Sequence, residues 1–87
     1  MNLEKDLNEV IGFFNLYKKT KNNHLLNEIK FETRSSSYVI ILKESIEKQN
    51  FPAYDVNCFI DEVVDSDSKD FKYYKKYVLT VDFERII

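Results

Sequence analysis

The chain has 87 residues, of which 44% are hydrophobic and 15% aromatic, so it holds enough core material for one small folded domain. Thirteen basic and fifteen acidic residues give a formal net charge of −2, whereas domains that bind nucleic acid through phosphate contacts usually carry a basic excess. These numbers exclude an intrinsically disordered chain and argue against a generic affinity for nucleic acid.

Several absences narrow the class of protein further. The single cysteine, Cys58, cannot form an intramolecular disulfide, and the amino terminus lacks a signal-peptide pattern. The longest apolar run, residues 38–42, is far shorter than the roughly 20 residues that span a bilayer. We therefore expect a cytoplasmic protein without a membrane segment. Many residues have AT-rich codons, which is consistent with a low-GC bacterium, its phage or a plasmid.

The first predicted element is an amphipathic helix at the amino terminus. Asn2 is suited to cap its start, acidic residues fall in its first turn, and lysines fall at its end. Residues 22–23 are expected to end it. The predicted core stripe recurs at spacings of three and four and consists of Leu3, Leu7, Val10, Ile11, Phe14 and Tyr17.

A β-hairpin is predicted next. Residues 25–33 alternate between apolar and charged side chains, residues 34–36 form a polar turn, and residues 38–42 are a continuous β-rich run. The second strand of this hairpin is expected to be central and covered on both faces. Residues 43–50 are predicted to be a loop or a short helix that ends before the Phe51-Pro52 turn.

Residues 55–65 fit two patterns. The apolar residues of this stretch match the helical spacing i, i+3, i+4, i+7, i+8, although their β-branching favours a strand. We predict a helix capped by Asp55. If residues 55–64 are instead extended, they add a fourth strand to the sheet.

The chain ends in a surface turn, residues 65–70, and a long strand. In this strand Tyr77, Leu79, Val81 and Phe83 are predicted to face inward. The predicted fold is α+β, a single domain over residues 1–87. It has an amino-terminal helix, an antiparallel sheet of three or four strands, and a short second helix packed on the sheet.

The sequence offers weak candidates for chemistry. Aspartates at 65, 67 and 70 suggest a calcium loop, but lysines and an aspartate stand where such a loop needs its remaining ligands and its glycine. Glu28 and Lys30 fit the solvent face of a strand better than half of a nuclease site. His24 and Cys58 have no partner nearby in sequence for nucleophilic catalysis or a zinc site. We expect no enzyme activity, no cofactor and no metal.

An acidic segment gives the main functional prediction. Between residues 55 and 70 there are six acids and one base. On a helix followed by a turn, the acids would share a face away from the core and could bind a basic protein surface. A homodimer through exposed tyrosines or an edge strand is an alternative. The predicted partner-binding residues are Asp61, Glu62, Asp65, Asp67 and Asp70.

Lysines and tyrosines are interspersed at residues 72–77, as in some grooves for single-stranded nucleic acid. A period of two places Lys72, Tyr74 and Lys76 on one side and the remaining residues on the other, so the cluster is divided between faces. A small nucleic-acid-binding domain using these three residues is therefore a secondary hypothesis.

The primary hypothesis is a non-enzymatic protein–protein interaction module. We expect a small, anti-CRISPR-like inhibitor of phage or plasmid type, whose acidic face occupies the nucleic-acid-binding site of a host or defence complex. An antitoxin or immunity-type protein that binds a cognate toxin is the alternative of the same class.

Overall fold

The computed structural model describes residues 2–19, 28–67 and 72–86, with only the backbone described at 65–67, 72 and 73. The described residues form two helices and three strands. In chain order these are α1 (Leu3–Lys19), β1 (Glu28–Thr33), α2 (Ser36–Glu47), β2 (Tyr54–Asp67) and β3 (Lys72–Arg85). The α+β fold class predicted from the sequence is confirmed.

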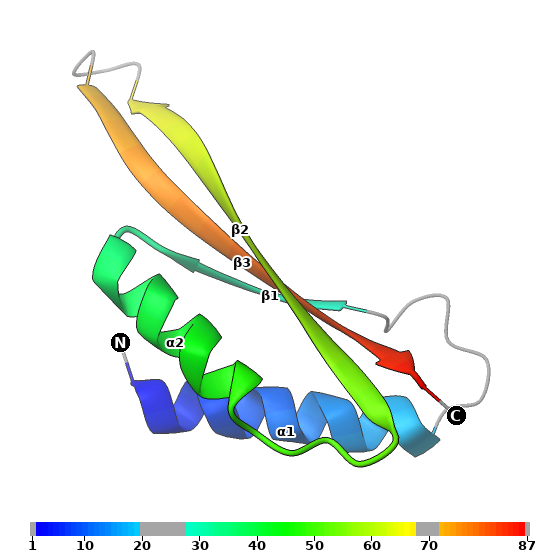
Figure 1. The fold of residues 1–87 in the computed structure, drawn as a ribbon. Helices are drawn as coiled ribbons and strands as arrows, with labels where there is room; N and C mark the ends of the chain where they lie inside the picture. The colour runs from blue at the N-terminus through cyan, green and yellow to red at the C-terminus, as the bar shows by residue number, and fades with distance from the viewer. Residues whose placement is uncertain (1, 20–27, 68–71, 87) are drawn as a thin grey trace.

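The three strands form one antiparallel sheet in the order β1-β3-β2, and both helices lie against one of its faces (Figure 1). β1 pairs with β3 from Glu28 opposite Asp82 to Thr33 opposite Tyr77. β2 pairs with β3 along its whole length. The central strand is therefore β3, the last in the sequence, and β2 is one edge of the sheet.

The β2–β3 hairpin extends well past the rest of the molecule (Figure 1). Its register runs without interruption from Tyr54 opposite Arg85 to Asp67 opposite Lys72, whereas β1 accompanies only residues 77–82 of β3. The molecule is accordingly elongated, with principal extents of 50 × 26 × 20 Å. The distal part of the hairpin, residues 63–67 of β2 and 72–76 of β3, is a two-stranded ribbon among the described residues.

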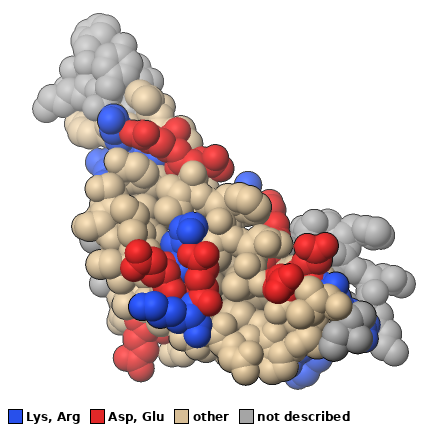
Figure 2. All heavy atoms as spheres, viewed as in Figure 1, with Lys and Arg blue, Asp and Glu red and all other residues tan. Residues whose placement is uncertain are grey.

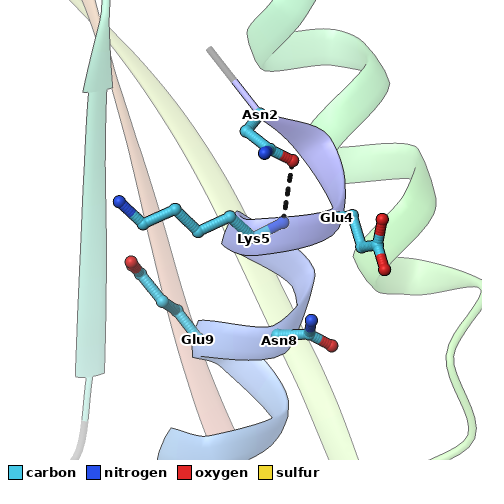
Figure 3. A pocket seen from close by; sticks show the side chains of 5 residues that line it. All are labelled: Asn2, Glu4, Lys5, Asn8 and Glu9. Carbon is cyan, nitrogen blue, oxygen red and sulfur yellow. Dashed lines mark hydrogen bonds between the residues drawn. The ribbon is translucent and has the colours of Figure 1, made fainter.

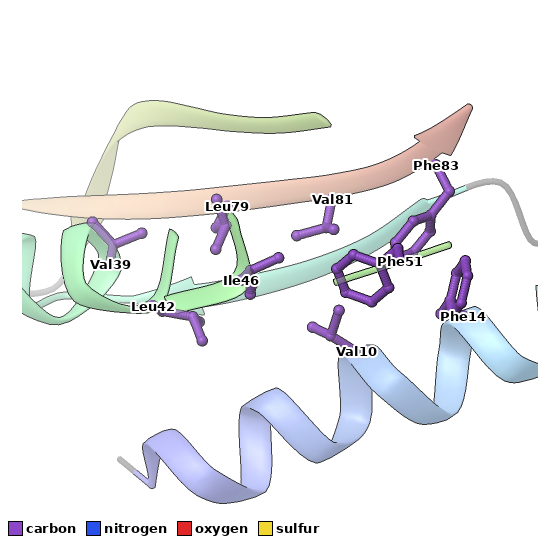
Figure 4. Close-up of a cluster of buried hydrophobic side chains, with 9 residues drawn as sticks. All are labelled: Val10, Phe14, Val39, Leu42, Ile46, Phe51, Leu79, Val81 and Phe83. Carbon is purple, nitrogen blue, oxygen red and sulfur yellow. The ribbon is translucent and has the colours of Figure 1, made fainter. Parts of the chain in front are cut away.

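The core lies between the sheet and the helices (Figure 4). Its aromatic end gathers around Phe14, whose ring centroid lies 4.8 Å from that of Phe51 and 4.9 Å from that of Phe83. Its aliphatic end lies between α2 and the middle of β3. The buried residues are Val10, Phe14, Val39, Leu42, Ile46, Phe51, Leu79, Val81 and Phe83.

α1 forms as predicted. Asn2 Oδ1 accepts a hydrogen bond from the Lys5 backbone N–H at 3.1 Å, which caps the first turn. Val10 and Phe14 are buried, and most of the remaining predicted stripe packs against the core. Tyr38 of α2 donates a hydrogen bond to the Asp6 carboxylate and so connects the two helices. Burial, together with this carboxylate, raises the pKa of Tyr38 to about 12.

The predicted first strand of the hairpin is confirmed over residues 28–33 as β1, but residues 38–42, predicted to be a central strand, instead lie in α2. The predicted pairing of these two segments as a hairpin is therefore wrong. Ser35 caps the helix, and Val39, Leu42 and Ile46 recur at helical spacing and are buried. Ile40 and Ile41 are 49% and 48% exposed. The β-branched residues are tolerated because burial of one helical face outweighs their modest helix propensity.

Residues 55–64, predicted to be a helix, instead lie in β2. The alternative of an extended segment is correct, but the sheet has three strands because residues 38–42 are helical. The helical spacing was misleading, because adjacent apolar residues of a strand lie on opposite faces of the sheet, and both members of the Val63–Val64 pair are exposed. Ile60 packs against the core, whereas its neighbour Phe59 is 55% exposed.

The cap of α2 gives a first prediction. Ser35 Oγ accepts the Tyr38 backbone N–H at 3.1 Å, so Ser35→Ala should lower the free energy of unfolding by about 0.5–2 kcal/mol in urea denaturation. Ser35→Gly should lower it by only a few tenths. Ser36→Ala, at an exposed position of the first turn, is the control. Equal effects of Ser35→Ala and Ser36→Ala would contradict the capping role.

Candidate functional site

The predicted acidic face is divided, because residues 55–64 form a strand instead of the predicted helix. In β2 the consecutive residues Asp61 and Glu62 lie on opposite faces of the sheet. Glu62 faces the helix side, where its Oε1 lies 3.1 Å from Lys75 Nζ. The backbone positions of Asp65 and Asp67 face Tyr74 and Lys72 across the hairpin. The side chains of Asp65 and Asp67, and all of Asp70, lie outside the described residues.

The Lys/Tyr set of β3 keeps its predicted alternation. Lys72, Tyr74 and Lys76 share the face of β3 that points away from the helices, although the side chain of Lys72 is not among those described. Two local contacts engage the others. Lys76 Nζ lies 2.8 Å from Glu32 Oε2, and the Arg34 guanidinium lies 4.7 Å from the centroid of the Tyr74 ring. These residues are thus tied to the adjacent end of β1.

The helices leave one face of the sheet uncovered, and we call it the open face. Register and alternating exposure place on it the odd-numbered residues of β2 and the even-numbered residues of β1 and β3. Its described side chains are Glu28, Lys30, Glu32, Asp55, Asn57, Phe59, Asp61, Val63, Tyr74, Lys76, Val78, Thr80, Asp82 and Glu84.

Carboxylates occupy facing positions on the open face. Asp55 lies directly opposite Glu84 between β2 and β3, and Asp82 lies directly opposite Glu28 between β3 and β1. Like charges at directly opposed positions of neighbouring strands destabilise a sheet. These two adjacent rows therefore concentrate negative charge at a cost in stability.

Few basic groups offset this charge. Lys30 lies 3.5 Å from Glu28, and Lys76 belongs to the Glu32 pair. Within the described part of the chain, no ion pair involves Asp55, Asp61, Asp82 or Glu84.

The helix side is different. Over α2, acidic and basic side chains lie beside one another (Figure 2), and Lys43 Nζ is 2.8 Å from Glu47 Oε1. Four carboxylates of the open face thus have no ion pair among the described residues, whereas α2 presents a mixed surface.

Exposed apolar side chains accompany the open-face carboxylates. On β2, Phe59 is 55% exposed and Val63 is 43% exposed, with Asp61 between them on the same face. Interfaces between proteins commonly combine an apolar centre with a polar rim. The open face has both components side by side.

The depressions of the surface are shallow. One of about 270 Å³ lies on the acidic end of the open face and is lined by Glu28, Asn57, Asp82, Phe83 and Glu84. Another, of about 480 Å³, lies at the start of α1 (Figure 3), where its five lining side chains come from the first two turns and spread to both sides of the helix. Within the described residues, no three His, Cys, Asp or Glu side chains are grouped to hold a metal ion.

Cys58 lies on the helix side of β2, where it packs against the core. Burial raises the pKa of its thiol to about 11, so the thiolate is scarce at neutral pH. His24, the only histidine of the sequence, lies outside the described residues. The structure therefore supports the interpretation of Cys58 as a packing residue.

The raised pKa predicts slow reaction of Cys58 with a thiol reagent near neutral pH, with a rate that rises with pH up to about 11. In the unfolded chain the same rate should level off near pH 8.5, the ordinary thiol range. Since the proton is held more tightly in the folded state, stability should decline as pH rises from about 9 to 11. Cys58→Ala should remove that part of the decline; rapid reaction of the native thiol at pH 7 would contradict the prediction.

With this geometry in view, the chain was compared with family models, curated proteins and solved structures. None of the three comparisons finds a match. No helix among the described residues is long and apolar enough to cross a membrane. The proposed function is therefore based on the open face itself.

Sequence reasoning missed the carboxylates at 28, 55, 82 and 84 as one group. It placed Asp82 and Glu84 on the outward side of the last strand, which is correct. It did not identify the strands that pair with this last strand, since Asp55 was predicted to cap a helix. A consistent strand assignment for residues 55–64 would have been the signal that brings the acids together.

Proposed function

We propose that the chain is a non-enzymatic module that binds a basic surface of another protein through its open face. The observation that supports this most directly is the opposition of Asp55 to Glu84 and of Asp82 to Glu28. Such pairs reduce stability, and a ligand that places lysine or arginine between them would relieve the repulsion. The exposed Phe59 beside them supplies an apolar contact for the same partner.

The kind of partner follows from this charge. A dense row of carboxylates can occupy a site that otherwise holds a phosphate backbone, because both present closely spaced negative charges. The chain would then act as a small inhibitor of phage or plasmid type, of the anti-CRISPR-like kind, on a nucleic-acid-handling complex. An antitoxin or immunity-type protein would use the same surface on a toxin.

The test reverses charge on the open face. In Asp82→Lys/Glu84→Lys both opposed rows become opposite-charge rows, so the variant should be more stable by about 0.2–1 kcal/mol for each row. The same variant should lose the protein that the native chain captures from a lysate of its host. Thermal unfolding would show that the loss is not due to misfolding.

The matched control is Glu4→Lys/Glu9→Lys, which makes the same change in net charge on exposed positions of α1. It should retain the partner. Undiminished capture by the Asp82→Lys/Glu84→Lys variant would contradict the proposal.

A direct titration separates the nucleic-acid alternative. The isolated protein is expected to show no tight binding to single-stranded or duplex oligonucleotides at low or moderate salt. Micromolar binding with a steep dependence on salt would instead indicate a nucleic-acid-binding domain. Substitutions of Tyr74 and Lys76 would then test which side chains bind the nucleic acid.

A further inference from the structure

The outer edge of β2 is a second interaction surface. The strand runs from Tyr54 to Asp67 and is the last in the order β1-β3-β2, and the described residues include no strand paired to its outer side. An edge strand presents a row of backbone N–H and C=O groups that another strand can pair with. β2 is 14 residues long, whereas strands commonly have about 5–6 residues.

Most of the features that block an edge are missing from β2. It contains no proline and no lysine, and its pairing to β3 advances one residue at a time without a bulge. Short length, proline, bulges and charged side chains, lysine above all, are the usual means by which proteins prevent unwanted pairing, and of these β2 has only its acidic residues. β1, the other edge, is by contrast short and contains Lys30.

Charge decides what can occupy this edge. β2 contains five acidic residues and no base: Asp55, Asp61, Glu62, Asp65 and Asp67. A second copy of β2 beside the first would bring only acids and uncharged residues together, and like charges on adjacent strands are unfavourable. A strand carrying lysine or arginine would gain the opposite-charge pairs instead.

The side-chain pattern adds a register. On the open face of β2, Asp61 stands between the exposed Phe59 and Val63, so acid and apolar positions alternate along the edge. A strand laid against it would match this pattern with a basic residue beside Asp61 and apolar residues on either side. Backbone pairing would supply affinity, and the alternating side chains would supply specificity.

We propose that the outer edge of β2 binds, by strand addition, an extended segment of a partner protein that presents on one face a Lys or Arg between apolar residues. This inference rests on the proposed function, because it assigns to the basic partner a defined mode of docking. It adds that backbone hydrogen bonds, and not charge alone, hold the partner.

Synthetic peptides test the mode of docking. The probe, called the Lys–Val peptide, has about ten residues: Val and Lys take turns at every second position, so that they alternate on one face, and Thr fills the positions between them. Two further versions carry N-methyl groups on alternate residues, one for each edge of the peptide, which removes backbone donors and keeps the charge. A Glu–Val peptide of the same length is the charge control. Affinity is measured by fluorescence anisotropy, and protection of the β2 amides by hydrogen exchange.

The Lys–Val peptide should bind and protect β2 amides, and one of its two methylated versions should bind about tenfold more weakly or worse. The Glu–Val peptide should not bind. Equal affinity of all three Lys–Val versions would overturn strand addition, as would a failure of the Lys–Val peptide to bind. A dimer of the free chain with protected β2 amides would also overturn the proposal, since a second copy would then occupy the edge.

Two variants separate this proposal from the more general one. Asp61→Lys changes a carboxylate on the edge strand, whereas Asp82→Lys changes one on the central strand. Strand addition predicts a larger loss of peptide affinity for Asp61→Lys. If the two variants lose equal peptide affinity and the methylated peptides bind equally well, the acidic open face is the docking site and the edge of β2 is not. The converse result is that methylation weakens peptide binding while the Asp82→Lys/Glu84→Lys variant still captures the partner. That result would show that the partner docks on the edge of β2 and not on the open face.

Discussion

Replacing Phe14 by alanine is expected to lower the free energy of unfolding by about 3–5 kcal/mol. The Phe14 side chain is 4% exposed and lies at the aromatic end of the core. Its ring meets those of Phe51, Tyr54 and Phe83 at centroid distances of 4.8–5.2 Å. The substitution therefore opens a cavity and removes three aromatic contacts, which contribute beyond the buried area.

Phe59→Ala is the matched control, since it deletes the same atoms from an exposed position. Phe59 is 55% exposed on the open face, so its loss should cost no more than about 1 kcal/mol, the range of strand propensities. Urea denaturation of both variants measures the difference. Similar destabilisation by the two substitutions would contradict the placement of the core.

A loss of 3–5 kcal/mol is large for a domain of this size, because folded domains are stable by only about 5–15 kcal/mol. Phe14→Ala should accordingly leave a detectable unfolded population at ambient temperature. Phe59→Ala should remain folded and be usable in binding experiments. It thus also tests the apolar contact proposed for the open face.

The sequence predicts best where one physical signal is unopposed. α1 combines a helical stripe, a capping Asn2 and charges that suit the helix dipole, and all three agree. Residues 79–84 of β3 alternate between buried and more exposed side chains, so Leu79, Val81 and Phe83 were assigned to the core correctly. Local preference and tertiary packing favour the same structure in both elements.

Prediction failed where local preference and packing conflict. Residues 38–42 are rich in β-branched side chains yet form part of α2, because Val39, Leu42 and Ile46 together bury one helical face. β2 shows the converse: its spacing suits a helix, but pairing with β3 along 14 residues gives it a complete ladder on one side. Neither the burial of one face of α2 nor the pairing of β2 with β3 can be recognised within a local window of sequence.

The open face was predictable only in part. The outward direction of Asp82 and Glu84 follows from alternation in β3 alone. Their opposition to Glu28 and Asp55 depends on strand order and register, which join residues far apart in the sequence. The candidate site therefore depends on the order and register of the strands. The acidic segment that the sequence indicated contributes only one of these strands, β2.

Leu42→Ala should lower the free energy of unfolding by about 2–5 kcal/mol, whereas Ile40→Ala should lower it by well under half as much. On α2, Leu42 is 0% exposed and Ile40 is 49% exposed. In a strand these residues, two apart, would share a face and respond alike. The comparison therefore tests the helix directly.

Thermal and urea unfolding of both variants provide the measurement. For a domain of this length each kcal/mol corresponds to a change of about 4–8 °C in Tm, so the two variants should be well separated. Ile41→Ala, at a position 48% exposed, should resemble Ile40→Ala. Equal and large losses of unfolding free energy for Leu42→Ala and Ile40→Ala, with Ile41→Ala neutral, would instead indicate a strand over residues 38–42. The sheet would then need a fourth member, and the helix side of the core would have to be rebuilt around α1 alone.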